Sequence, residues 1–419
     1  MRPARRLLLA CTPAILAVGL VHAAATARAD ATYTITDLGN ANPLGIDAAG
    51  DVLLRGDPGY NGIYHSYGPQ AGTVTSFTAY GLPADTNTYG GSTQVAAIAS
   101  NGTLYGTMLN PGVWQPFVDQ AGHITTIGTL TGMQSSGNIA GNAVGQAVGI
   151  DYAGPGGANP HGYLFSNGQL TDLGANVIPN AINNNGAVTG VYNPIANAAP
   201  HAFLYQDGKM TDLGSLGGAQ VVGAALNDHG QVVGNSQIPT ATPPGSNSFN
   251  FQEHAFLYAN GKMTDLGTLA TNSPGASSEA IGINNAGQVV GTSGGSAFVW
   301  QSGTMTDLGK ILRTVPSFTF GNVEGSTPAG INDLGQIIGN EPQAFGPNLF
   351  VEHGFLLTPT GAPAPASILP DPFPAPEPGT WLIFSVISAA GLLRAARKRR
   401  SRREGLTLST PAHLMNSIS

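Results

Sequence analysis

Four histidines could carry chemistry, because they recur at the same place in four similar segments of the chain. They are His161, His201, His254 and His353. If the segments form a ring, the imidazoles form a ring too, and such a ring could bind a metal ion or an anionic ligand. In the alternative interpretation, each histidine begins a strand and bonds the backbone of a neighbouring repeat. Ser296 fills the same place in a fifth segment, so the imidazole is replaceable, and we expect the structural role and no metal site.

Asparagine-rich loops offer a second kind of chemistry. Residues 183–186 are Asn-Asn-Asn-Gly and residues 332–335 are Asn-Asp-Leu-Gly, and their side-chain oxygens are of the type that Ca²⁺ prefers. The loops lack the carboxylate density and the final glutamate of a dedicated calcium loop. We therefore expect them to turn the chain, with calcium as the one cofactor left open.

An aspartate recurs in the tetrapeptide Thr-Asp-Leu-Gly, at Asp172, Asp212, Asp265 and Asp307. An enzyme needs a catalytic residue once, so a residue present in most repeats is expected to be structural, and we predict a buried aspartate that caps a turn. The chain contains no Gly-x-Ser-x-Gly, His-Glu-x-x-His or phosphate-binding loop that can be told apart from the repeat. The only cysteine, Cys11, precedes the mature domain. We predict no catalytic, cofactor-binding or metal-binding residue.

Two features outside the repeat leave an enzymatic alternative open, a polysaccharide lyase or glycoside hydrolase. One is a set of glutamates that the repeats do not share, and two of them would have to converge at one rim: Glu253, Glu279, Glu324, Glu341 and Glu352. The other is a pair of inserts at residues 238–252 and 318–328, because loops on a rigid scaffold often carry binding residues. In the first insert, Phe249 and Phe251 have no role in the repeat, so they either stack on sugar rings or pack over a strand edge.

These residues are positioned by a repeat of 41 to 57 residues. Its clearest copy is residues 283–291, Ile-Asn-Asn-Ala-Gly-Gln-Val-Val-Gly, and the copies begin at residues 46, 98, 141, 182, 226, 283 and 331. Repeats of this length are typical of propellers, solenoids or arrays. The motif predicts a hairpin, with Asn and Gly turning the chain and Val-Val on the following strand.

A second motif predicts a second hairpin in each repeat. Residues 201–214 are His-Ala-Phe-Leu-Tyr-Gln-Asp-Gly-Lys-Met-Thr-Asp-Leu-Gly, with close copies at 161–174, 254–267 and 296–309. The central pairs Asn167-Gly168, Asp207-Gly208, Asn260-Gly261 and Ser302-Gly303 indicate type I′ turns, which need positive φ at both residues. Each repeat therefore holds about four short strands.

Seven repeats of four strands predict an all-β, closed seven-bladed β-propeller. Residues 32–39 match only the second half of the second hairpin, and residues 353–357 match only its first half. Together they complete one blade, and such a split blade closes the ring without a large exposed sheet edge. An open β-solenoid is the alternative, but a solenoid does not require its first and last units to be complementary halves.

The repeat resembles the HAF family of probable extracellular repeats, through His201-Ala202-Phe203 and His254-Ala255-Phe256. The resemblance covers about residues 32–358 and is specific in the central repeats. It implies export and a repeated β-fold, and it implies no established reaction.

Both ends of the chain resemble targeting signals. Residues 1–29 form a signal peptide with a basic start, an apolar stretch and Ala27-Arg28-Ala29 as cleavage site; a retained anchor, or lipidation at Cys11, is the alternative. A proline-rich linker, 359–375, precedes residues 376–403, where Pro376, Glu377 and Pro378, an apolar run at 381–393 and a basic cluster resemble a PEP-CTERM sorting signal. The resemblance implies processing by an exosortase-type enzyme and transient insertion in the inner membrane of a Gram-negative bacterium. A short permanent anchor is the alternative, since a polar tail, 404–419, follows.

The charge distribution limits the partners. Of 16 basic residues, four lie in the N-terminal cluster and seven in the C-terminal one, so the domain at 30–358 is strongly acidic and nucleic-acid binding is excluded. We expect an exported, non-catalytic surface or extracellular-matrix protein that binds a glycan, a cell surface or itself. A neutral or cation-bridged carbohydrate suits the acidic domain better than a polyanion.

Overall fold

The structure, a computed structural model, describes residues 33–361 except 57–61, 67–69, 81, 83–92, 111–112, 131–133, 153–159, 195–198, 240–251, 271–274, 314–324 and 345–349. The chain divides into two compact units, residues 1–370 and 371–419. All described residues belong to the first unit. Phe249, Phe251 and the predicted sorting residues Pro376, Glu377 and Pro378 lie outside the described residues.

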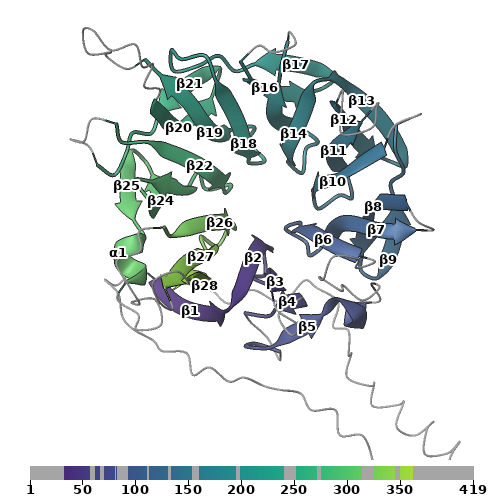
Figure 1. Cartoon of the computed structure of the whole chain (residues 1–419), viewed down its shortest axis with the longest axis horizontal. Helices are drawn as coiled ribbons and strands as arrows, with labels where there is room; N and C mark the ends of the chain where they lie inside the picture. Colours follow the sequence, from purple (N-terminus) through teal and green to yellow (C-terminus); the bar gives the residue numbers. More distant parts are fainter. Residues whose placement is uncertain are drawn as a thin grey trace, which may run out of the picture. The chain divides into compact units, whose positions relative to one another are not determined.

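The described strands form seven four-stranded antiparallel sheets arranged as the blades of a β-propeller, which confirms the predicted fold (Figure 1). The first strand of each blade lies at the centre of the ring, and the following strands lie successively further out. The strands of blades 1 to 3, from the centre outward, are β2 (Ala41–Ile46), β3 (Val52–Gly56), β4 (Gly62–Tyr64), β5 (Val74–Ser76); β6 (Thr93–Ile98), β7 (Leu104–Asn110), β8 (Val113–Gln120), β9 (His123–Thr126); β10 (Gln134–Gly141), β11 (Ala147–Tyr152), β12 (Pro160–Ser166) and β13 (Gln169–Ala175).

Blades 4 to 6 follow the same plan. Their strands are β14 (Val177–Ile182), β15 (Val188–Tyr192), β16 (His201–Gln206), β17 (Lys209–Asp212); β18 (Val221–Leu226), β19 (Val232–Ile238), β20 (Gln252–Ala259), β21 (Lys262–Asp265); β22 (Ser278–Ile283), β23 (Val289–Ser293), β24 (Ser296–Gln301) and β25 (Thr304–Asp307). Two short helices, the 3₁₀ helix η1 (Phe77–Tyr80) and α1 (Gly309–Leu312), follow the outer strands of blades 1 and 6.

Blade 7 is built from both ends of the propeller sequence. Its inner strands β26 (Thr327–Ile331), β27 (Ile337–Ala344) and β28 (Phe350–Pro359) are completed by β1 (Tyr33–Gly39) as the outer strand. The pairing of β1 with β28 places Ile35 opposite Leu357 and Asp37 opposite Phe355. The predicted split blade is therefore confirmed, and the ring is closed by strand pairing.

The turn residues of the two motifs fulfil their predicted roles. In the outer hairpin of blade 4, Asp207 and Gly208 have φ values of 52° and 76°, and the other predicted pairs have positive φ as well. The glycine that ends the Val-Val-Gly sequence is needed for a different reason. A Cβ atom at Gly291 would lie 1.9 Å from the carbonyl oxygen of Glu279. This close approach occurs next to a β-bulge between Ala280 and Gly282 of the inner strand.

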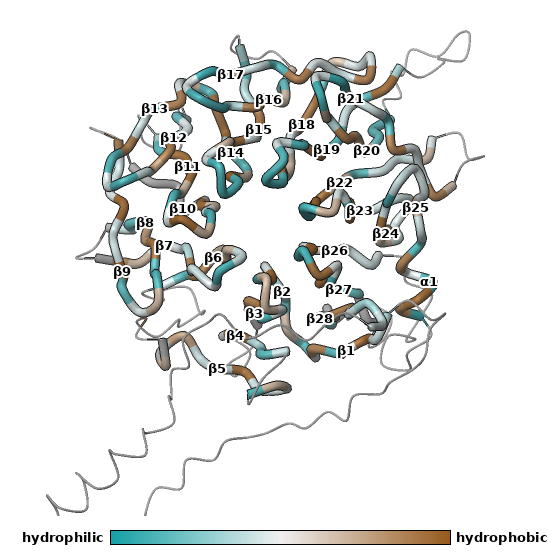
Figure 2. The backbone as a smooth tube through the Cα atoms, turned by 180° about the vertical axis from the view of Figure 1, so that it is seen from behind, coloured by the Kyte–Doolittle hydropathy of each residue, from teal (hydrophilic) through white to brown (hydrophobic). Residues whose placement is uncertain are grey.

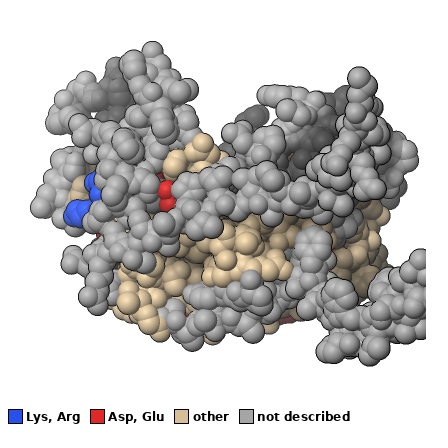
Figure 3. Space-filling model, turned by 90° about the horizontal axis from the view of Figure 1, so that it is seen from below, with Lys and Arg blue, Asp and Glu red and all other residues tan. Residues whose placement is uncertain are grey.

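The hydrophobic core lies between neighbouring blades. The phenylalanines of the His-Ala-Phe motifs, Phe203 and Phe256, and Phe355 at the equivalent place in blade 7 are fully buried. One core cluster joins Val233 and Ala255 of blade 5 to residues of blade 6 that include Phe298, so a single repeat cannot bury its own apolar face. The loops at the inner ends of β14 and β18 are hydrophilic (Figure 2), and the described surface in Figure 3 carries few charged side chains.

Candidate functional site

A cavity of about 200 Å³ lies where the inner hairpins of all seven blades meet at one mouth of the central channel. Each blade contributes three consecutive residues, beginning with the last or nearly the last residue of its inner strand, such as Ile283, Asn284 and Asn285 in blade 6. Sites that enclose a drug-sized ligand have volumes of about 300–1,000 Å³. The mouth can therefore hold a small group or the end of a chain.

An incomplete ring of asparagine amides, which runs from blade 3 through blade 7 to blade 1, links the blades at the mouth. The Nδ2 atom of Asn183 donates to the carbonyl oxygen of Asn227 at 2.9 Å, and Asn227 donates in the same way to Asn284 at 3.0 Å. Equivalent bonds run from Asn142 to Asn183, from Asn284 to Asn332 and from Asn332 to Asp47. The first asparagine of the Ile-Asn-x-x-Gly motif thus links one blade to the next, a role that the sequence analysis did not identify.

The glutamine of the same motif supports this ring. In blade 6, Asn284 Nδ2 also donates to Gln288 Oε1 at 2.8 Å, and Asn284 Oδ1 accepts from Gln288 N at 2.9 Å. The four-residue spacing of Asn and Gln was a signal that could have revealed this pair. The predicted turning role of the loops is confirmed, since Gly186 and Gly335 have φ values of 77° and 74°.

The next residue of each loop forms a second ring, and four of its members alternate between amide and carboxylate. Asp228 accepts from Asn184 N–H at 2.9 Å, from Asn184 Nδ2 at 3.0 Å and from Asn285 Nδ2 at 3.1 Å. Asp333 accepts from the backbone N–H and Nδ2 of Asn285. Partial burial opposes ionisation of Asp228, but the hydrogen bonds from Asn184 and Asn285 and the nearby His229 outweigh it and lower its pKa.

The histidines that opened the sequence analysis do not form a shared site. Each imidazole Nδ1 lies close to the aspartate of the adjacent strand in its own blade: His161 to Asp172 at 3.0 Å, His201 to Asp212 at 2.8 Å, His254 to Asp265 at 2.8 Å and His353 to Asp37 at 3.3 Å. The expected partner, the backbone of a neighbouring blade, was therefore wrong for these contacts. Within the described ranges, no group of three or more His, Cys, Asp or Glu side chains could hold a metal ion.

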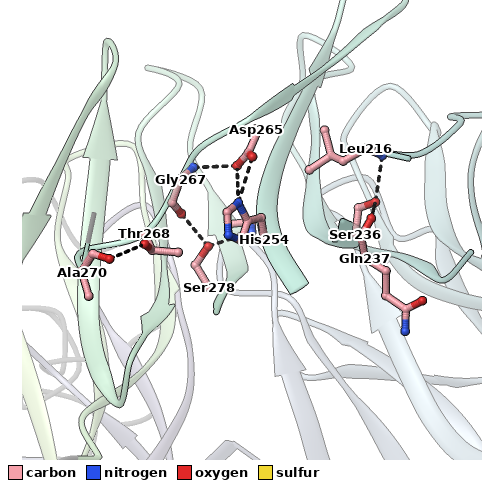
Figure 4. Close-up of polar contacts among 10 residues, drawn as sticks. Leu216, Ser236, Gln237, His254, Asp265, Gly267, Thr268, Ala270 and Ser278 are labelled. Carbon is pink, nitrogen blue, oxygen red and sulfur yellow. Dashed lines mark hydrogen bonds and ion pairs between the residues drawn. The ribbon is translucent and has the colours of Figure 1, made fainter. Parts of the chain in front are cut away.

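The aspartates of Thr-Asp-Leu-Gly cap turns, as predicted. Asp265 Oδ1 accepts from Gly267 N at 2.7 Å (Figure 4), and Asp212 does the same for Gly214. Their burial was predicted wrongly, because the side chains of Asp172, Asp212 and Asp265 are 45, 40 and 42 % exposed. They lie on the outermost strand of each blade, whose far edge faces no further strand.

In blades 5 and 6, a buried serine of the second strand connects the blade to the loop that follows the outer strand of the preceding blade. Ser236 Oγ accepts from Leu216 N at 3.0 Å (Figure 4), and Ser293 Oγ accepts from Leu269 N at 3.0 Å. Residues 291–295 match Gly-x-Ser-x-Gly, but Ser293 is 3 % exposed and its hydroxyl also donates to Ser277 O. It is a structural residue of the repeat.

Blade 1 replaces the Asn–Gln pair by two aspartates. Asp47 and Asp51 are 0 and 1 % exposed, and His65 contacts Asp51 Oδ2 through Nδ1 at 3.2 Å. Asp47 Oδ1 accepts from the N–H groups of Ala49 and Asp51, while its Oδ2 atom has no hydrogen-bond partner. Burial, and then the Asp51 carboxylate, raise the pKa of Asp47 to about 8.

Two of the unshared glutamates interact near the opposite ends of the inner strands. Glu253 is the second residue of β20 and Glu279 the second residue of β22. Burial, and then the Glu253 charge, raise the pKa of Glu279. Asn235 Nδ2 donates to Glu253 Oε2 at 2.5 Å. Glu341 is buried elsewhere, beside Arg313 and Ser326, and burial raises its pKa to about 7. Glu324 and the side chain of Glu352 lie outside what the structure describes.

The membrane and binding-insert predictions fall on other parts of the chain. No helix within the described residues is long and apolar enough to cross a membrane. The predicted apolar run at 381–393 is not among those residues, and neither are Phe249 and Phe251.

No known family profile and no curated protein matches the chain. Among solved structures it is similar to TolB from Acinetobacter baumannii, with 13 % identity, 49 % of each chain covered and a TM-score of 0.30. The chain thus spans about half the length of that protein. It is also similar to the β-propeller domain of the trilobed protease from Pyrococcus furiosus (8 % identity, 64 and 79 % covered, TM-score 0.42) and to a gluconolactonase from Xanthomonas campestris (11 % identity, 78 and 89 % covered, TM-score 0.34). At these values the similarity concerns the fold alone.

Proposed function

We propose that this protein is an exported, non-catalytic surface or extracellular-matrix protein, and that the channel mouth binds the hydroxyl-rich end of a neutral carbohydrate. The observation that carries the proposal is the ring of Asn184, Asp228, Asn285 and Asp333. Its side chains are fixed by bonds between blades, so a ligand would meet an ordered polar surface and little binding energy would be lost to ordering it.

The hydrogen-bonding capacity of the ring favours a donor ligand. A carboxylate has about four acceptor sites, and the protein donates to Asp333 only through the N–H and Nδ2 of Asn285 among the contacts at the mouth. Both carboxylates therefore retain capacity to accept hydrogen bonds from hydroxyl groups. No lysine or arginine lines the mouth, so a polyanion would be repelled.

Export and processing complete the proposal. The N-terminal 29 residues act as a signal peptide, and the sorting residues Pro376, Glu377 and Pro378 are cleaved by an exosortase-type enzyme after transient insertion in the inner membrane. The resemblances described from the sequence support this part. Replacing the three residues by alanine should leave the protein in the inner membrane, and intact mass analysis of the surface form should find a chain without the arginine-rich tail.

A glycan array probed with the purified protein tests the binding function. We expect binding to neutral glycans, and a loss of at least tenfold in affinity for Asp333→Asn. Asp207→Asn is the matched control, because it removes the same charge at an outer-hairpin turn where blades 3 and 5 carry Asn167 and Asn260. Binding that is unchanged in Asp333→Asn would place the ligand elsewhere.

The meeting of Glu253 and Glu279 favours one second candidate, a glycoside hydrolase or polysaccharide lyase. Two carboxylates at one rim are what glycoside hydrolysis requires. The same glycans are therefore followed for product release. Depolymerisation that is abolished by Glu279→Gln would replace the binding function by the enzymatic one.

A further inference from the structure

The side chain of Asn235 is buried beside the Glu253 carboxylate, and only one end of its amide has a hydrogen-bond partner. It is 8 % exposed, its Nδ2 atom donates to Glu253 Oε2, and its Oδ1 atom has no hydrogen-bond partner. A buried carbonyl oxygen without a partner costs on the order of 1–3 kcal/mol. Such an atom in a native structure calls for a donor or a cation.

The internal repeat shows which residue faces this amide. Asn340 holds the same place in blade 7, one residue after the glycine of the second strand, and its Nδ2 donates to Asn42 Oδ1 of blade 1 at 2.8 Å, while its Oδ1 atom, like that of Asn235, has no hydrogen-bond partner. Glu279 holds the place of Asn42, since each pairs with the second strand at the position next to the inner bulge. The contact between blades 5 and 6 therefore brings Glu279 to Asn235.

The difference between these two junctions is one of charge. At the junction of blades 7 and 1, the inner-strand residue is an amide, and two neutral side chains bond directly. At the junction of blades 5 and 6, it is the carboxylate of Glu279, and a second carboxylate, that of Glu253, accepts a hydrogen bond from the asparagine Nδ2. Burial, and then the nearby Glu253 charge, raise the pKa of Glu279.

No basic side chain offsets these charges in the described part of the chain. None of the ion pairs there involves Glu253 or Glu279. Carboxylates and an asparagine carbonyl oxygen are ligands that Ca²⁺ prefers, with water completing a coordination number of six to eight. A divalent cation would satisfy the Asn235 oxygen and neutralise both glutamates at once.

We propose that Asn235 Oδ1, Glu253 and Glu279 bind Ca²⁺ and thereby join blade 5 to blade 6. The site is distinct from the channel mouth, and it does not depend on the carbohydrate function. With three protein ligands and a partly exposed position, its affinity belongs to the range of extracellular calcium modules, a Kd of about 0.1–1 mM.

Isothermal titration and thermal denaturation of the purified protein with CaCl₂ test the site. We expect one saturable site at about 0.1–1 mM, a melting temperature that rises with calcium, and at least a tenfold weaker Kd for Glu279→Gln. Glu253→Gln serves as the second variant, because its amide oxygen can still accept from Asn235. Asp207→Asn is the control, since it removes a carboxylate at an outer-hairpin turn where blades 3 and 5 carry asparagine, and it should leave calcium binding unchanged.

Three results would overturn the proposal. One is the absence of any calcium-dependent titration or stabilisation in the wild-type protein. The second is calcium binding that survives Glu279→Gln or that disappears in Asp207→Asn. The third is a Glu279→Gln variant whose only change is a loss of pH dependence, because a proton on Glu279 would then supply the donor to Asn235.

Discussion

Blades 1 and 7 are neighbours built on the same strand plan, but they close their inner hairpins with different chemistry. In blade 7, Asn332 Oδ1 accepts from the N–H groups of Leu334 and Gln336, and Nδ2 donates to Gln336 Oε1 and to Asp47 O of blade 1. In blade 1, Asp47 Oδ1 makes the same two turn bonds, to Ala49 and Asp51. The Oδ2 atom that replaces Nδ2 has nothing to donate.

The comparison separates two functions of one side chain. The acceptor oxygen shapes the turn, and Asn and Asp perform this equally, so the backbone of blade 1 keeps the plan of the repeat. The amide donor bonds the glutamine of the same loop and the carbonyl oxygen of the next blade. A carboxylate can replace this donor only when it carries a proton. Burial, and then the Asp51 carboxylate, raise the pKa of Asp47, so the inner hairpin of blade 1 is sensitive to pH where the asparagine hairpin of blade 7 is not.

The largest expected effect concerns the closure that brings the two blades together. Deleting residues 33–39 removes β1, which leaves the edge of β28 unpaired and exposes a core that contained Tyr33, Ile35 and Leu38. Burial of a large apolar side chain contributes about 1.5–3 kcal/mol, so we expect the free energy of unfolding to fall by on the order of 5 kcal/mol. Urea denaturation followed by circular dichroism measures it.

A synthetic peptide of residues 32–40 should restore part of this stability by adding the missing strand, and a peptide carrying Ile35→Asp is the control. A deletion variant that unfolds at the wild-type urea concentration would contradict closure by β1.

The second effect is expected for Asp47→Asn in blade 1. A folded-state pKa near 8, against 3.8 for the free side chain, means that the protonated form is favoured in the folded protein. Its stabilising contribution is complete below about pH 4 and is lost as the pH rises through about 8. At about 1.4 kcal/mol per pKa unit, the loss has an upper limit on the order of 5 kcal/mol.

Asparagine supplies the missing donor and does not titrate. We therefore expect Asp47→Asn to stabilise the protein at pH 8 and to have little effect at pH 4, as measured by urea denaturation across this range. Asp207→Asn, at an exposed turn, should leave the pH profile unchanged. An Asp47→Asn variant with the wild-type slope between pH 4 and 8 would show that another group causes it.

The third effect is the reverse change in blade 7. Asn332→Asp keeps the turn bonds but directs a carboxylate oxygen at the carbonyl oxygen of Asp47 and at Gln336. We expect a loss of about 1–3 kcal/mol, the cost of a buried polar group without a partner, and the loss should grow with pH as in blade 1. A variant as stable as wild type at pH 8 would mean that the link between the blades contributes nothing.

The sequence predicts the parts of this molecule that depend on local spacing. The two hairpins, the positive φ of Asp207 and Gly208, and the split blade all follow from turn residues and from complementary ends. The sequence does not reveal the asparagine ring, because Asn227 and Asn284 are 57 residues apart in the chain and come into contact only when blades 5 and 6 lie side by side. The meeting of Glu253 with Glu279 is hidden for the same reason. The exposure of Asp212 was not predicted, because the repeat pattern does not indicate which strand of a blade is the outermost.

The smallest expected effect concerns the His–Asp pairs, which compare a continuous hairpin with the seam of blade 7. His201 and Asp212 are both 40 % exposed, so His201→Ser, which copies the natural Ser296, should cost at most about 1 kcal/mol. The pKa of Asp212 is lowered, because hydrogen bonds from Gly214 N–H, His201 and Tyr192 outweigh the effect of partial burial. The contribution of this pair to stability is therefore present above about pH 4 and is lost as the pH falls further.

His353 and Asp37 are 16 and 20 % exposed and join the two ends of the propeller sequence. His353→Ser should therefore cost more, about 1–2 kcal/mol, in parallel urea titrations at pH 7. If both variants lose the same free energy of unfolding, the His–Asp pair at the seam of blade 7 stabilises the protein no more than the pair in a continuous hairpin.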